Sequence, residues 1–417
     1  MVNQLLLDEN TQINLLDQKY YRSNIMKALI KLAIMSFLVV FMFGCGKRTE
    51  SIPKESVQET TTAQTKIEAG IIFETTNARE LTFCIAGTGT IRIEWKDGHL
   101  THNLYTRSIQ APWAIGETNG VINLTTPNDF GQVVINGAGI KYFSAGINRY
   151  TDELGIHFVG QNITKIDLTQ ANDLYWLQLD NNPLTGIDIS KNTKLEYLYL
   201  TNNQISNLDI SQNSKLRDLS INNNPITHLD ISNNAVIRYV TAQNNQLTNF
   251  IFGNNPNIGT LDLTSNKLKN IDLTKVTTLI AVTVKDNQLS TLDISTNPLL
   301  ISLDVSNNLL SGLNLDKNLD METLWLSFNK FTGFDASKLH MLRMLEIYNN
   351  PLSAKELNKL FHSLSTNPID ADQNKVLLYS GNTGANDDEV DITIAHKRNW
   401  MVFNEKDDMR RHELELN

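Results

Sequence analysis

This 417-residue sequence has only two cysteines, no excess of basic residues and a single long apolar run. With Cys45 placed where a processing signal would put it, Cys84 has no internal partner, so the folded parts depend on packing rather than on disulfides. Lysine and arginine number 36 against 45 acidic residues, a net charge of −9. A chain without a basic surface is a poor binder of phosphates, so we expect no nucleic-acid partner.

Catalytic and metal-binding motifs are also missing. The eight histidines are scattered without ligand spacing, and no Gly-x-Ser-x-Gly, phosphate loop or His-Glu-x-x-His segment occurs. A glycosidase needs two carboxyl groups in one cleft, and the sequence alone leaves such a pair open. We therefore expect a protein that binds rather than catalyses, without a cofactor or a metal ion.

The one long apolar run, Ala28–Phe43, follows Lys27 and ends at Gly44-Cys45, after which the sequence becomes polar. Its length of about 16 residues is short for a membrane span, which needs about 20. This is the architecture of a secretory signal. The run and its cysteine resemble the lipobox of bacterial lipoproteins, which implies cleavage before Cys45 and acylation of Cys45. A retained anchor helix is the alternative, and either reading predicts export.

The polar stretch after the signal predicts a tether. We expect residues 1–45 to be leader and signal peptide, with translation starting at Met26, and residues 46–66 to be a disordered link, because Ser, Thr, Gln, Glu and Lys dominate them. Multiple acyl chains on Cys45 would hold the chain on a membrane.

Residues 67–150 alternate apolar and polar side chains in short runs separated by turns. Leu81–Ile85 and Ile91–Trp95 are two such runs. They predict a small antiparallel β-sandwich ahead of the rest of the chain. The stretch Gly87–Gly98 resembles the hairpin that precedes the repeats of Gram-negative leucine-rich-repeat surface proteins, although Lys96 stands where glycine is common.

Apolar residues then return at intervals of 21. The first and last of them, Leu174 and Leu342, are 168 residues apart, which is eight periods without an insertion or deletion. Each period reads LxxLxLxxNxLxxLDIxxN, a form that resembles the short bacterial leucine-rich repeat. The resemblance implies a mainly β solenoid with a parallel β-sheet over residues 151–352. In Leu198-Tyr199-Leu200 the leucines should face the interior and Tyr199 the outside.

Asparagine occupies one position of each period. We predict that these amides satisfy backbone groups that turn inward where the chain leaves the sheet, because an amide offers two donors and an acceptor. This structural ladder comprises Asn182, Asn203, Asn224, Asn245, Asn266, Asn287, Asn308, Asn329 and Asn350.

A second asparagine series should have the same role, with local irregularity where Val276 and Leu339 interrupt it. Its members are Asn192, Asn213, Asn234, Asn255, Asn297 and Asn318. The Leu-Asp-Ile segments between the two series alternate like strands, so their aspartates should form an exposed acidic stripe. Calcium binding by this stripe stays open as an alternative.

After the last repeat, Ser353 precedes Glu356 by three positions, which indicates a helix that starts there and runs to about Ser363. Strands are expected near residues 376–379 and 400–402, with a short helix between them. This resembles the terminal module of the same surface-protein family and implies an α/β C-terminal cap over residues 353–404. The charged residues 405–417 form a tail.

Outward strand positions vary between periods, and they are free of packing demands. Aromatic residues gather at the two ends of this predicted concave face, with small polar residues between them. Exposed aromatic side chains are favoured at binding surfaces, although they can also simply cover the sheet. The candidate ligand-binding residues are Trp176, Tyr197, Tyr199, Tyr239, Trp325, Phe328 and Tyr348.

Together these features resemble internalin-like or adhesin-like repeat lipoproteins of the Gram-negative envelope. The resemblance implies a lipid-anchored monomer on the outer membrane, at the cell surface, that binds a protein or glycan ligand. A passive envelope scaffold without a specific external ligand is the alternative.

Overall fold

The computed structural model describes residues 69–76, 80–87, 89–96, 101–109, 121–125, 130–136, 140–144, 162–366, 375–378, 381–382 and 389–403. The predicted start at Met26, lipidation at Cys45, tether and charged tail lie outside these residues. Within them, no helix is both long and apolar enough to cross a membrane.

Seven strands precede the repeats and pair antiparallel with one another, as the alternation predicted. Buried side chains from both of their sheets, among them Ile71, Ile85 and Phe143, belong to one core. The strands are β1 (Ala69–Thr76), β2 (Glu80–Gly87), β3 (Gly89–Lys96), β4 (Thr101–Ile109), β5 (Val121–Thr125), β6 (Phe130–Asn136) and β7 (Ile140–Ser144).

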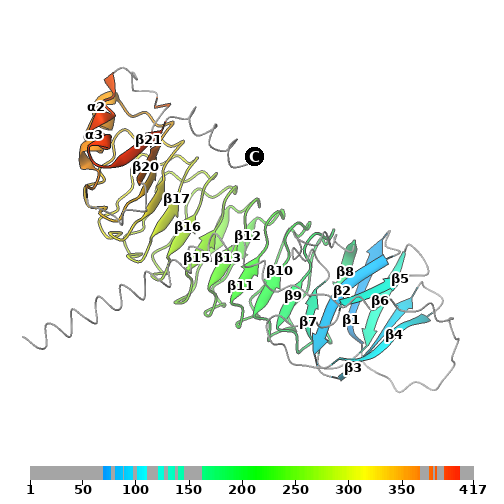
Figure 1. Ribbon diagram of the computed structural model, residues 1–417. Coiled ribbons are helices and arrows are strands. Elements are labelled where there is room, and N and C mark those ends of the chain that lie inside the picture. Colours follow the sequence, from blue (N-terminus) through cyan, green and yellow to red (C-terminus); the bar gives the residue numbers. More distant parts are fainter. Residues whose placement is uncertain are drawn as a thin grey trace, which may run out of the picture.

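These strands do not stand apart from the repeats. Strand β7 pairs parallel with β9 (Trp176–Gln178), so β7, β2 and β5 extend the sheet of the solenoid. Strand β8 (Ile163–Asp167) pairs with β1 and so joins the second sheet, whose order is β4-β3-β6-β1-β8. The first repeat is therefore covered by both sheets at one end of the elongated molecule (Figure 1).

Each repeat contributes one three-residue strand to a parallel sheet. The register never shifts: Leu198, for example, lies opposite Leu177 and Leu219. After β9 these strands are β10 (Tyr197–Tyr199), β11 (Asp218–Ser220), β13 (Tyr239–Thr241), β15 (Thr260–Asp262), β16 (Ala281–Thr283), β17 (Ser302–Asp304), β18 (Thr323–Trp325) and β19 (Met344–Glu346).

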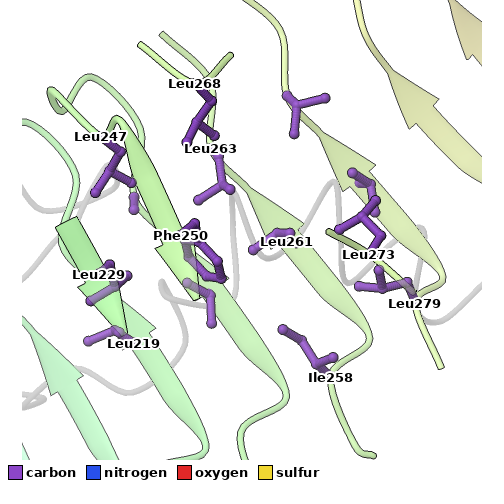
Figure 2. Packing of buried hydrophobic residues seen from close by; sticks show 14 of the residues in the cluster. Leu219, Leu229, Leu247, Phe250, Ile258, Leu261, Leu263, Leu268, Leu273 and Leu279 are labelled. Atoms are coloured by element: carbon purple, nitrogen blue, oxygen red, sulfur yellow. The ribbon is translucent and has the colours of Figure 1, made fainter. Parts of the chain in front are cut away.

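Leucines, isoleucines and valines fill the interior of the coil. Leu198 and Leu200 are fully buried, as the alternation predicted, and equivalent residues of successive turns stack on one another (Figure 2). A turn by itself would leave this apolar interior open to water, so each turn depends on its neighbours.

The first asparagine series lies inside the coil. The Asn203 Nδ2 group donates to the carbonyl oxygens of Leu179 (2.9 Å) and Leu200 (2.9 Å), while Asn203 Oδ1 accepts from the Leu184 amide (3.2 Å). The Leu179 oxygen belongs to the preceding turn, so the side chain links two turns. No other side chain of this size offers both donors and an acceptor without a charge.

The fold is a leucine-rich-repeat solenoid.

The second asparagine series is fully buried and links turns in a similar way. Asn213 Nδ2 donates to the carbonyl oxygens of Ile189 (3.1 Å) and Asn192 (2.9 Å). The expected irregularity at Val276 and Leu339 is wrong. Both side chains are buried, and their amides form the same tight turn, Val276 N to Leu273 O (3.2 Å), as in the other repeats. An apolar residue of similar bulk therefore fills the space without disturbing the backbone.

A third column was not anticipated. The residue just before each ladder asparagine has a positive φ, for example 58° at Asn202 and 56° at Asn223. Asparagine tolerates this left-handed conformation better than most side chains. Several of these amides also bond along the column, with Asn223 Nδ2 donating to Asn202 Oδ1. The sequence signal was the recurring Asn-Asn doublet.

Most Leu-Asp-Ile segments are not strands, contrary to the prediction. Among the described residues, β12 (His228–Asp230) and β14 (Asn249–Ile251) pair with each other on this side of the coil, and β8, which contains Asp167, pairs with β1. The aspartates are exposed as expected, but each caps a turn: Asp188 Oδ1 accepts from the Ser190 amide at 2.9 Å. This hydrogen bond lowers the pKa of Asp188.

The predicted α/β cap is confirmed. Helix α2 (Ala354–Ser363) begins after Ser353, whose side chain accepts a hydrogen bond from the Glu356 amide. The parallel sheet continues through β20 (Lys375–Leu378) and β21 (Trp400–Phe403), and α3 (Thr393–His396) precedes the last strand.

The cap contains one further turn of the repeat. Met344 pairs with Val376, which aligns Asn349-Asn350 with Gly381-Asn382. Gly381 has φ 69°, and a Cβ there would lie 2.2 Å from Asn349 Oδ1. Asn382 is buried and accepts from the Asn350 amide at 2.9 Å. The cap is thus a repeat lengthened by α2 between its strands.

Replacing Asn224 by alanine should lower the free energy of unfolding by about 2 kcal/mol or more, because buried carbonyls and one amide lose their partner. Asn224 is 4% exposed and donates to Leu200 O (2.8 Å) while accepting from the Ile205 amide (3.0 Å). The matched control is Asn233→Ala, at an exposed position. Urea unfolding that gives equal values for both variants would contradict the ladder's role.

Candidate ligand-binding face

The outward side chains of the parallel sheet form two rows that run along the solenoid. We call this surface the sheet face; it corresponds to the predicted concave face. The first row is Trp176, Tyr197, Asp218, Tyr239, Thr260, Ala281, Ser302, Thr323 and Met344, and the second is Gln178, Tyr199, Ser220, Thr241, Asp262, Thr283, Asp304, Trp325 and Glu346.

Three of the candidate residues form one cluster at the N-terminal end. The Trp176 ring stacks on Tyr197, with centroids 4.9 Å apart, and lies 5.0 Å from Tyr199. Tyr175 meets Tyr197 edge to face at 6.3 Å. Trp176 and Tyr197 are half-buried, so each keeps part of its ring in contact with solvent. We call Trp176, Tyr197 and Tyr199 the N-terminal cluster.

Tyr199 does not present the exposed ring that its outward position suggested. Only 6% of Tyr199 is accessible, because its ring packs beside Trp176. It supports the cluster rather than offering a surface of its own. Tyr239 is half-buried and lies two strands from Tyr197, so it is not stacked in this group.

An acidic residue that sequence reasoning missed lies between these tyrosines. Asp218 occupies the first row, flanked by Tyr197 on β10 and Tyr239 on β13. Burial raises the pKa of Asp218 to about 6, although Arg238 and Arg217 oppose the shift. Burial also raises the pKa of Tyr197 and Tyr239. The position is visible in the 21-residue register, but a prediction based on aromatic and small polar residues passes over it.

Small polar residues occupy the middle of the sheet face and bond to one another. The Ser220 hydroxyl lies 3.0 Å from the Thr201 hydroxyl and accepts from Thr241 at 3.1 Å. These hydroxyl groups make the middle of the sheet face less apolar than its two ends.

The other three candidates surround one hollow at the C-terminal end. Trp325 lies on β18 between Asp304 and Glu346, which occupy the same row on β17 and β19. The Phe328 and Tyr348 rings meet edge to face at 5.3 Å. The hollow measures about 540 Å³, and its lining also includes Lys285, Asp286, Ser306 and Asn307. We call it the C-terminal hollow.

Phe328 and Tyr348 do not lie on strands, although the prediction placed both at outward strand positions; Tyr348 follows the end of β19 at Glu346. Phe328 lies in the turn after β18, with φ 55°, in the column where most turns have asparagine. Phe328 is 46% exposed. A bulky residue in the left-handed region is unfavourable by roughly 1–2 kcal/mol. The shift from strand to turn could not be seen in the sequence because the period alone does not mark where each strand ends.

The carboxylates of the hollow are held in place by hydrogen bonds. Asp304 Oδ1 accepts from the Ser306 amide (2.9 Å), and Asp286 Oδ1 accepts from Asn307 Nδ2 (2.7 Å). Burial raises the pKa of Asp304 despite the Ser306 hydrogen bond. In the part of the chain that the structure describes, no three potential metal ligands come together.

No protein-family model matches the chain, and no curated protein matches it. Solved structures do. The functional domain of InlJ from Listeria monocytogenes, which includes a cysteine ladder, is 27% identical with TM-score 0.48, over 57% of this chain and 55% of that chain. A leucine-rich-repeat protein of Leptospira interrogans is 23% identical with TM-score 0.41, over 56% and 66%. YopM, an effector of Yersinia pestis, is 24% identical with TM-score 0.41, over 51% and 56%.

The matched region therefore spans between about half and two thirds of each of these bacterial leucine-rich-repeat chains.

The Asp218→Asn variant should be more stable than the parent near pH 7 and equally stable near pH 3. The folded state binds the Asp218 proton more tightly than the unfolded state, because its pKa is raised from 3.8 to about 6. Stability from this group is therefore fully present below pH 3.8 and is lost as the pH rises from there through 6. Thermal melts at both pH values measure the difference; an advantage for the variant that persists at pH 3 would contradict the assignment.

Proposed function

We propose that the chain is a lipid-anchored recognition protein of the bacterial outer membrane, exposed at the cell surface, and that its sheet face binds a protein or a glycan. The observation that carries this proposal is the N-terminal cluster. Trp176 and Tyr197 are stacked and half-buried on the sheet, where each keeps part of its surface accessible. Rings fixed in this way lose little conformational entropy when a ligand covers them.

The fold supports binding in preference to catalysis. Short strands in constant register make a long face whose outward side chains can vary without disturbing the core. The protein is proposed to act as a monomer and without a cofactor. The lipid anchor rests on the sequence around Cys45 alone, and the proposed membrane partner is the bilayer that holds the acyl chains.

Replacing Trp176, Tyr197 and Tyr239 by alanine should weaken capture of the ligand at least tenfold, because the accessible parts of these half-buried rings supply the apolar contact. The natural test is capture from host and medium glycoproteins by residues 67–404. The control variant replaces Thr260, Thr283 and Ser302, in the middle of the sheet face, by alanine and should capture the ligand as well as the parent does. If the aromatic variant captures as well as the parent and its fold is intact, this end of the face is not the binding surface.

Location is tested separately by protease treatment of intact cells. A surface-exposed chain should be digested on intact cells, whereas a periplasmic scaffold would be protected. Full protection from protease would favour the passive scaffold.

Lipidation is tested by labelling with a fatty acid. The Cys45→Ser variant should lose incorporation of the labelled fatty acid and appear outside the membrane fraction. Labelling of the variant would exclude Cys45 as the lipidated residue.

A further inference from the structure

The C-terminal hollow differs in charge from the N-terminal cluster. Among the described residues, its lining holds three carboxylates, from Asp286, Asp304 and Glu346, and one cationic group, from Lys285. Three aromatic residues line the same space. A site of this composition attracts a cation, and the aromatic rings select one with a flat or apolar surface.

The geometry places an aromatic ring between two acids. Asp304, Trp325 and Glu346 are consecutive in the second row, on strands that neighbour one another in the sheet. Adjacent strands are about 4.8 Å apart, so a group lying over Trp325 is within reach of both carboxylates. A neutral sugar would stack on the ring but would gain little from the two charges.

Of the cations that proteins offer, the guanidinium group of arginine fits these neighbours best. It is planar and weakly hydrated, so it stacks on aromatic rings, and its N–H groups donate to carboxylates at the same time. The ammonium group of lysine is compact and strongly hydrated, and it gains less from a ring.

Phe328 gives an independent indication that this end of the face binds something. Its backbone is strained, with φ 55°, at a position that asparagine, serine or aspartate occupies in the other repeats. The residue is 46% exposed, so core packing does not explain it. Residues held in sparsely populated backbone conformations cluster at ligand-binding and switch sites.

We propose that the C-terminal hollow receives an arginine side chain of a protein partner, stacked on Trp325 and paired with Asp304 and Glu346. Phe328 and Tyr348 form the wall beside it. This inference rests on the proposed recognition function and narrows the ligand of this end of the sheet face to a basic protein segment.

The test titrates the full chain with a short fluorescein-labelled peptide of alternating arginine and glycine, followed by fluorescence anisotropy. The comparison peptide has citrulline, which is uncharged, in place of arginine. The arginine peptide should bind at least about tenfold more tightly, and Trp325→Ala or the pair Asp304→Asn and Glu346→Gln should remove about tenfold of its affinity. The Asp304→Asn change keeps a side-chain oxygen for the Ser306 amide, so the paired variant should fold.

A matched variant separates the hollow from general attraction to an acidic protein. The double variant Asp188→Asn with Asp209→Asn also removes two negative charges, but from the opposite side of the coil, where both side chains cap turns. It should leave peptide affinity unchanged. The Phe328→Asn variant should weaken binding while its melting temperature stays the same or rises, because the strain is relieved.

Equal losses in the two charge variants, or no difference between the arginine and citrulline peptides, would overturn the inference. So would binding of a neutral oligosaccharide that depends on Trp325 and competes with the peptide. If glycoprotein capture still depends on Trp176 and Tyr197 in that case, the proposed function stands and only the arginine site fails. If neither the N-terminal cluster variant nor the C-terminal hollow variant changes the binding of any ligand, both the proposed function of the sheet face and the arginine site are wrong.

Discussion

The buried asparagine amide is the interaction on which the rest of the structure depends. A coil that leaves its sheet after three residues turns backbone groups toward an apolar interior, where an unpaired polar group is unfavourable. The Asn203 side chain satisfies carbonyls of its own turn and of the preceding one. Because the donor must reach a fixed distance into the neighbouring turn, the amides also fix the register, and the register aligns the outward rows of the sheet face.

Much of the fold could be predicted because it repeats. The spacing of 21 residues, the inward leucines and the helix after Ser353 follow from local pattern and from elementary capping chemistry. The continuity of the sheet could not be predicted. Strand β7 pairs with β9, and β1 pairs with β8, across long stretches of intervening chain. A local pattern predicts a strand but does not identify a distant partner, so a separate sandwich was the natural but incomplete expectation.

The candidate site was predictable in part, and the reason lies in what each residue contacts. The outward positions of Trp176 and Trp325 follow from alternation. The burial of Tyr199 follows from a ring on the neighbouring strand, which alternation does not address. Asp218 and Asp304 have raised pKa values because their surroundings exclude water, a property of the assembled face. A prediction based on aromatic residues therefore identified the rings that line each site but not the carboxylates, Asp218 and Asp304, beside them.

The unbroken period has a consequence for how such a protein can change in length. Every turn from Leu174 to Leu342 has the same number of residues and meets its neighbours in the same strand register. Whole turns can then be removed or duplicated as units, and the separation between the two ends of the face changes in steps of about 4.8 Å. The number of small polar turns at the centre of the solenoid therefore sets the distance between the N-terminal cluster and the C-terminal hollow.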